Sequence, residues 1–238
     1  MDSKKRSDAM PCPPPHNTGT LVANYSLERC AASSRNEAPT LPRLWQHGGA
    51  RNSASRTSDG LSALQAEKLI AAAREAAKQG KPFNRHITIH WEAAGVTDDK
   101  AMAATTAFLK AMRDWAGGMT AYLWVRENGD GKGSHVHILT HIAIDKKWHG
   151  PRAQRWIERI SGQPYRKSAI FTRKIKGCDH PASELYQVNL AAVLAYVLKG
   201  VDTETAAVLG IAHEAGGRVI GKRCGWSRNI TPRQAGGY

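Results

Sequence analysis

The sequence HVH at residues 135–137 is the segment whose residue types and spacing point most directly to chemistry. It lies in the β-rich run SHVHILTHIAI, where alternate side chains share one face of a strand, so His135 and His137 are presented together. Imidazoles placed in this way are natural ligands for a divalent ion. Two histidines on a strand are also consistent with ordinary polar residues, so a metal site requires a third ligand.

Glu127 is the candidate for that ligand, because it ends the preceding β-rich run eight residues before His135. The sequence NGDGKG between the two runs is typical of a hairpin turn. If the pairing is symmetric about Gly131, Glu127 lies opposite His135, with Cβ atoms roughly 5 Å apart, and His137 is the diagonal neighbour. A two-residue turn would shift the pairing by one residue and turn the carboxylate to the other face. With an odd loop, the mixed histidine and carboxylate set suits Mg²⁺ or Mn²⁺.

Tyr196 is the candidate nucleophile. It lies in VLAYVLKG with Lys199 at the i+3 position of an expected helix, where the ammonium could offset phosphate charge. Tyr186 shares that helix but lies ten residues earlier, about 15 Å along the axis and roughly 80° around it, so both tyrosines cannot face one metal site. The alternative is an amphipathic helix with a tyrosine at its rim and a solvated lysine.

The elements that must position these residues alternate between helix and strand. Residues 61–79 are dominated by helix formers, with Ser58 or Asp59 as an N-cap and Gly80 as a stop. Strands are expected at 85–92, 119–127, 134–144 and 169–175, and further helices at 97–115, 151–161 and 183–200. This order predicts an α+β fold with a central antiparallel β-sheet and flanking helices.

Length and composition predict one catalytic domain and a tail, since the chain has 238 residues with 41% hydrophobic content. Residues 1–57 are rich in Pro, Ser, Asn and Arg and are expected to form a disordered basic arm, which leaves 58–238 for the domain. The four cysteines form no CxxC pair, and neither a signal peptide nor a membrane span is evident. A soluble, cytoplasmic protein is therefore expected.

The formal net charge of +14 suggests a nucleic acid as the partner. Residues 146–176 carry a run of Lys and Arg interleaved with aromatic side chains, a pattern that suits unpaired bases and a phosphate backbone. The aromatic residues are Trp148, Trp156, Tyr165 and Phe171. The tail 216–229, with Arg218, Lys222, Arg223 and Arg228, is a second candidate contact region. His141 is expected to be structural, with a phosphate contact as the alternative.

Three motifs in this order resemble those of rolling-circle replication initiators of the HUH endonuclease superfamily: HITIH at 86–90, Glu127 ahead of HVH, and Tyr196 followed by Lys199. The resemblance covers about residues 80–200. It implies an endonuclease in which Glu127, His135 and His137 hold the metal and Tyr196 becomes joined to the 5′ phosphate of the cut DNA, leaving a free 3′ hydroxyl. The implied partners are single-stranded DNA at an origin hairpin and a host helicase and polymerase.

Several alternatives remain open. Relaxases of the superfamily usually carry the tyrosine upstream of the histidine pair, and one-tyrosine transposases typically have Gln in place of Lys199. The sequence His86-Ile-Thr88 also resembles half of a two-histidine phosphoesterase, which would need neither metal nor Tyr196. A non-catalytic DNA-binding protein with the same fold is a further possibility. GGRVIGKR at 216–223 approximates a P-loop, but Arg223 stands where Ser or Thr is required, so no ATPase is expected.

Overall fold

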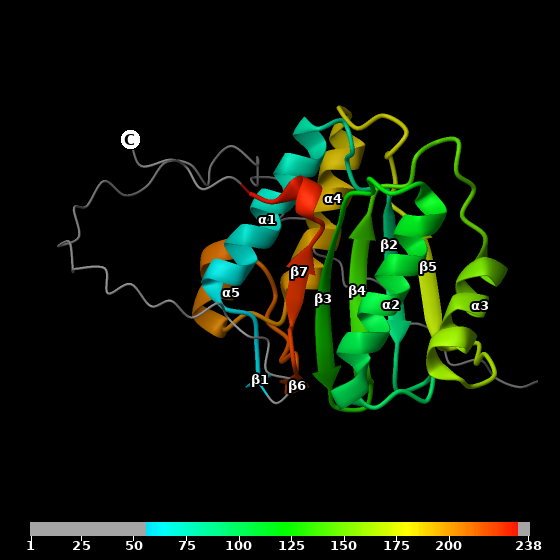
Figure 1. The fold of residues 1–238 in the computed structure, drawn as a ribbon. Coiled ribbons are helices and arrows are strands. Elements are labelled where there is room, and N and C mark those ends of the chain that lie inside the picture. Colours follow the sequence, from blue (N-terminus) through cyan, green and yellow to red (C-terminus); the bar gives the residue numbers. More distant parts are fainter. Residues whose placement is uncertain (1–55, 233–238) are drawn as a thin grey trace, which may run out of the picture. The chain divides into compact units, whose positions relative to one another are not determined.

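The computed structural model describes residues 56–232, and their core is a five-stranded antiparallel sheet (Figure 1). The strand order is β5 (Ile170–Lys174), β2 (Arg85–His90), β4 (Gly133–Thr140), β3 (Tyr122–Gly129) and β7 (Cys224–Trp226). Two short strands, β1 (Thr57–Ser58) and β6 (Val219–Ile220), pair separately. The predicted α+β class with an antiparallel sheet is confirmed.

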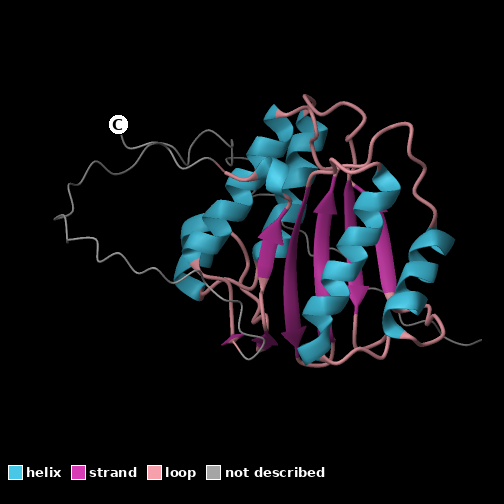
Figure 2. Cartoon of the chain, viewed as in Figure 1, coloured by secondary structure: helices cyan, strands magenta, loops and turns pink. Residues whose placement is uncertain are grey.

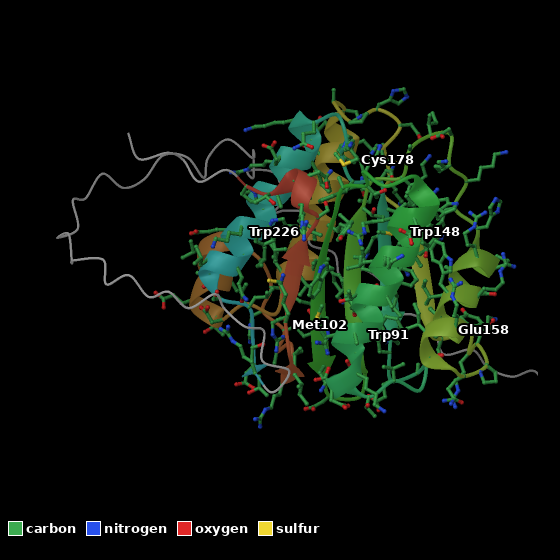
Figure 3. The ribbon with its side chains drawn as sticks, in the orientation of Figure 1. Trp91, Met102, Trp148, Glu158, Cys178 and Trp226 are labelled. Carbon is green, nitrogen blue, oxygen red and sulfur yellow. The ribbon has the colours of Figure 1, made fainter. Side chains whose placement is uncertain are left out.

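Helices cover both faces of this sheet (Figure 2). On one face, α2 (Asp98–Ala116) and α3 (Gly150–Ser161) bury Ile87, Ile89, Val136 and Ile138. Trp91, labelled in Figure 3, belongs to this core. Its indole donates a hydrogen bond to Thr105 Oγ1 of α2. The sheet thus rests on a continuous apolar layer on its α2 and α3 side.

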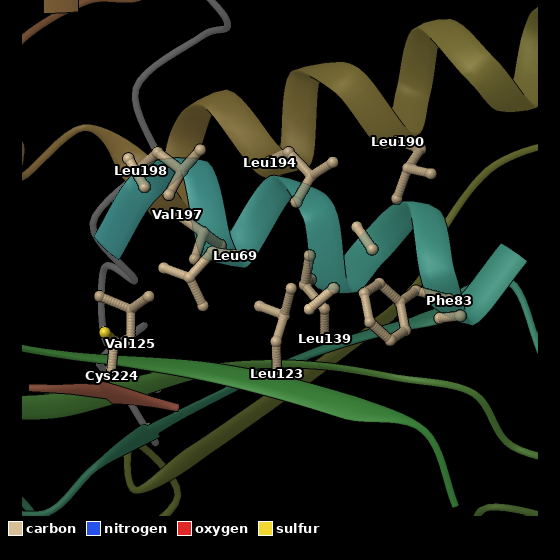
Figure 4. Close-up of a cluster of buried hydrophobic side chains, with 14 of the residues drawn as sticks. Leu69, Phe83, Leu123, Val125, Leu139, Leu190, Leu194, Val197, Leu198 and Cys224 are labelled. Atoms are coloured by element: carbon tan, nitrogen blue, oxygen red, sulfur yellow. The ribbon is translucent and has the colours of Figure 1, made fainter. Parts of the chain in front are cut away.

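The opposite face packs against α1 (Ala63–Lys78) and α4 (Glu184–Leu198). Side chains of both helices converge on apolar side chains of β3, β4 and β7 (Figure 4). The sheet residues in this second core are Leu123, Val125, Leu139 and Cys224. This face also carries His135 and His137, because they alternate with Val136 and Ile138 along β4.

The observed element boundaries correct several expectations. The first helix begins after Ser62, which forms a capping box with Gln65, so neither Ser58 nor Asp59 is its cap. Helix α5 (Thr203–Leu209), β6, β7 and the 3-10 turn Arg228–Ile230 were not predicted. They are too short to show a periodic pattern, and β7 exists as a strand through its pairing with distant β3.

The predicted arm, residues 1–57, lies outside the described residues except for Arg56 and Thr57, and Thr57 begins β1. Among residues 56–232, no helix combines the length and apolarity needed to cross a bilayer.

Candidate metal centre

The β3–β4 hairpin has the register that the metal hypothesis requires. Its loop contains three residues, 130–132, and pairs Gly129 with Gly133 and Glu127 with His135. Gly133 has a φ of 61°, a left-handed backbone conformation that favours glycine, so the residue type at this position suits the hairpin. The predicted placement of Glu127 and His135 on one face is confirmed.

Three ligand atoms converge at this position. Glu127, His135 and His137 are all buried, and each offers one atom within 4.8 Å of the others. Glu127 Oε2 lies 3.2 Å from His135 Nε2 and 3.8 Å from His137 Nε2. The second distance is too long for a hydrogen bond, so Glu127 does not satisfy His137. The group could hold a metal ion.

Neighbouring groups orient both imidazoles with Nε2 toward the centre. His135 Nδ1 lies 2.8 Å from the Gly133 carbonyl oxygen, which can only accept, so Nδ1 carries the proton and Nε2 keeps its lone pair. His137 Nδ1 lies 3.0 Å from Thr88 Oγ1 and 3.4 Å from His86 Nε2. A partner on the outer ring nitrogen of this kind is typical of metal-ligating histidines.

The unmet hydrogen-bonding capacity of the cluster also fits a cation. Among the described residues, Glu127 Oε1 and His137 Nε2 are buried without a hydrogen-bond partner, which is costly in a protein interior. Burial lowers the pKa of His137 despite the nearby Glu127, so its imidazole is neutral, the form that binds metals. Burial alone would raise the pKa of Glu127, but His135, His137 and Lys199 outweigh it and lower that pKa.

Lys199 lies directly after α4 and is buried, so the solvated lysine of the alternative interpretation is wrong. Its ammonium is 3.2 Å from Glu127 Oε2 and 2.9 Å from Glu214 Oε2. Glu214 is in turn 2.9 Å from Lys132 Nζ in the hairpin loop. Burial acts to lower the pKa of Lys199, but the two carboxylates outweigh it and raise that pKa. Lys199 therefore clamps the Glu127 carboxylate, a contact that its sequence position did not reveal.

The two helix tyrosines have different environments. Tyr196 is 45% exposed, and its ring centroid lies 5.1 Å from that of His137 and 5.1 Å from Lys199 Nζ. Tyr186 is 1% exposed and donates a hydrogen bond of 2.7 Å to the Phe83 carbonyl oxygen, and burial raises its pKa. Of the two, Tyr196 lies beside the cluster with an accessible ring.

The predicted nucleic-acid contacts divide into exposed and buried groups. Phe171 is exposed, whereas Trp156 is buried and Trp148 packs against it. Arg223 is also buried, and its guanidinium binds Ser58 and the loop 216–217, so its prediction as a surface contact is wrong. His141 is structural, as its Nδ1 lies 2.7 Å from the Pro82 carbonyl oxygen.

Comparison of the chain with protein-family models, curated proteins and solved structures found no match. The functional argument therefore depends on the residues of this chain.

Proposed function

We propose that the protein is a metal-dependent endonuclease that nicks single-stranded DNA, with Tyr196 as the nucleophile. The observation that supports this most directly is the buried group of Glu127, His135 and His137 with unpartnered ligand atoms, beside an exposed tyrosine. A bound Mg²⁺ or Mn²⁺ would polarise a phosphodiester oxygen and offset the charge that develops there. The formal net charge of +14 is consistent with a phosphate backbone as the substrate.

The proposed step is a transesterification at one phosphodiester. The Tyr196 phenol oxygen attacks phosphorus, its proton passes to water, and the bond from phosphorus to the DNA 3′ oxygen breaks. The 3′ oxygen leaves with the electron pair and takes up a proton. The products are DNA joined through its 5′ phosphate to Tyr196 and a strand with a free 3′ hydroxyl that can prime synthesis. One ester replaces another, so no nucleotide hydrolysis is required.

Replication initiation is the form of this activity that we favour. Glu127 and HVH precede the tyrosine, and Lys199 follows it, as in rolling-circle initiators that the sequence resembles. The clamp by Lys199 on Glu127 gives this lysine a physical role at the same centre. An origin hairpin would supply the single strand, and a host helicase and polymerase would extend the nicked product.

The test is covalent adduct formation with single-stranded DNA and Mn²⁺, read on a denaturing gel. Wild-type protein should form an adduct that EDTA prevents, and Tyr196→Phe should abolish it while DNA binding persists. Tyr186→Phe is the matched control, because it removes a hydroxyl from the same helix that contacts only the Phe83 carbonyl. Cleavage that needs neither metal nor Tyr196 would favour the phosphoesterase, and DNA binding without cleavage would favour a non-catalytic protein.

A further inference from the structure

The sheet face that carries the metal cluster is divided into two halves. Under α1 and α4, β3 and β7 contribute apolar side chains to a buried core. Strands β2 and β5 contribute no buried apolar side chain to this core among the described residues. Their side chains on this face are polar or aromatic and partly or fully exposed: His86, Thr88, His90, Phe171 and Arg173. The second half is therefore an open surface next to the metal ligands.

Phe171 lies on this open half. It is paired with Thr88, which is paired with His137, so two strand spacings of about 4.8 Å separate Phe171 from a metal ligand. Its neighbour Ile170 packs into the core under α2 and α3, which fixes Phe171 on the metal side. Phe171 is 51% exposed. The packing of the sheet does not require an apolar side chain at this position, because a polar residue could also stand there.

An aromatic path connects Phe171 with the metal ligands. The Phe171 and His90 rings meet edge to face, with centroids 5.7 Å apart. His90 then stacks on His135, with centroids 5.2 Å apart and an interplanar angle of 20°. Phe171 is thus held laterally by His90 while half of its surface stays open. Such a ring on an open sheet is the type of platform on which unpaired bases stack.

The charges around Phe171 suit a nucleic-acid strand. Arg173 lies two residues further along β5, on the same face, and is exposed. Arg166 and Lys167 are exposed just before the strand. The sequence from Arg159 to Cys178 contains no Asp or Glu. A phosphate backbone that passes over this surface would meet cations and no opposing carboxylate from this segment.

We propose that Phe171 stacks on an unpaired base of single-stranded DNA, with Arg173 contacting the adjoining phosphate. The inference deepens the proposed function, because it places part of the DNA strand beside the metal centre. A lone exposed phenylalanine is common on protein surfaces. Here its face, its contact with His90 and the acid-free segment all favour the same ligand. Stacking uses the π face that every base has, so this subsite holds the strand without reading its sequence.

The first experiment measures binding of a labelled single-stranded deoxyoligonucleotide to the full chain in EDTA, where no cleavage can contribute. Phe171→Ala and Phe171→Leu should each weaken binding at least about fivefold, because both lose the aromatic face. Phe171→Trp should restore wild-type affinity. Leu185→Ala is the matched control, since Leu185 is an apolar side chain of α4 that is 60% exposed. Equal binding by Phe171→Ala and wild type, or wild-type affinity of Phe171→Leu, would overturn the stacking subsite.

The second experiment locates the base directly. Oligonucleotides that carry 5-iodouracil at successive positions are irradiated with the protein, and the crosslinked residue is identified by mass spectrometry. One position should crosslink to Phe171. With an oligonucleotide that lacks this base, wild type and Phe171→Ala should bind with equal affinity. Crosslinks confined to other residues would contradict the proposal. If DNA binding depends on Phe171 but no adduct forms at Tyr196, the nuclease proposal alone is refuted. If the Tyr196 adduct forms but DNA binding does not depend on Phe171, the stacking subsite alone is refuted.

Discussion

Arg126 and Glu127 are consecutive in β3, and both are buried, but they point to opposite faces of the sheet. The Arg126 guanidinium donates to Asp98 Oδ1 at 2.6 Å and to the Ile220 carbonyl oxygen at 2.7 Å. Asp98 also accepts hydrogen bonds from Ser134 Oγ and the Ile220 amide. Arg126 and Asp98 thus form a network that joins α2, β4 and β6. The Arg126 guanidinium leaves only Nε without a hydrogen-bond partner among the described residues, and that atom is an N–H donor, which cannot bind a cation.

Glu127 is in a different situation. One of its carboxylate oxygens lies close to His135, His137 and Lys199, while the other has no hydrogen-bond partner among the described residues. A buried charge that is neutralised by an ion pair and held by further hydrogen bonds stabilises the fold once its desolvation is offset. A buried charge with open ligand atoms is suited to a cation that is added later. Arg126 is therefore part of a structural ion pair, whereas Glu127 has the properties of a metal ligand.

The largest effect on stability should come from the Arg126–Asp98 ion pair. Asp98→Ala leaves Arg126 buried without its carboxylate, so the free energy of unfolding should fall by about 3–5 kcal/mol. Urea denaturation of the metal-free protein measures it. Glu127→Gln should cost much less under the same conditions, because Lys199 keeps Glu214 as a partner. Equal losses in the two variants would mean that Glu127 is also a structural ion pair, and the contrast would fail.

Metal binding should stabilise the protein through the open cluster. At a Mn²⁺ concentration 100 times its dissociation constant, the free energy of unfolding should rise by about 2.7 kcal/mol. Glu127→Gln should remove this gain, because it removes a charged ligand. Asp99→Asn is the matched control, as Asp99 is an exposed acid at the start of α2. A gain that persists in Glu127→Gln would place the metal elsewhere.

The stability of the metal-free protein should fall with acid because the fold lowers the pKa of histidines at the cluster, among them His86. The pKa of His86 is lowered to about 3, mainly by burial and further by its electrostatic interactions with His137 and Arg173. An unfolded histidine titrates near pH 6.5, so between about pH 3 and 6.5 the unfolded chain binds more protons and is favoured. The slope is up to about 1.4 kcal/mol per pH unit for this group. Urea denaturation across this range in EDTA measures how the free energy of unfolding depends on pH. This dependence should be weaker for His86→Gln than for wild type, and an unchanged dependence would contradict the lowered pKa of His86.

The smallest effect is expected at the ion pair between Lys199 and Glu214. Glu214 is half exposed, so Glu214→Gln should lower the free energy of unfolding by less than about 1 kcal/mol. It should also weaken Mn²⁺ binding by up to about fivefold in calorimetric titration, because Lys199 then neutralises only Glu127 and competes with the cation. Asp114→Asn breaks the exposed pair with Lys110 and should leave Mn²⁺ affinity unchanged. Identical metal binding by both variants would remove Glu214 from the account.

Local sequence signals were sufficient for the hairpin and its ligand set. Alternation along β3 and β4 and the glycine-rich loop specify which side chains share a face, so Glu127, His135 and His137 could be grouped from sequence. Alternation also identified β2, but not that His86 and Thr88 would contact His137, because that depends on which strands pair.

The contacts that the sequence could not reveal join distant segments. Glu214 reaches Lys132 and Lys199 from a loop after α5, and no local pattern marks it. Arg223 was counted with the surface cations because composition does not distinguish a solvated arginine from one that is buried in hydrogen bonds. The contacts of Glu214 and the burial of Arg223 both depend on which distant segments pack together, and such packing leaves no periodic pattern in the sequence.

Peptide mapping of the DNA adduct tests the central claim most directly. Trypsin should release residues 177–199 as one peptide that contains both Tyr186 and Tyr196, so fragmentation in the mass spectrometer is needed to distinguish them. The account predicts a nucleotide attached through its 5′ phosphate to Tyr196, formed only with Mg²⁺ or Mn²⁺. A nucleotide on Tyr186, or cleaved DNA that never becomes attached to the protein, would contradict it.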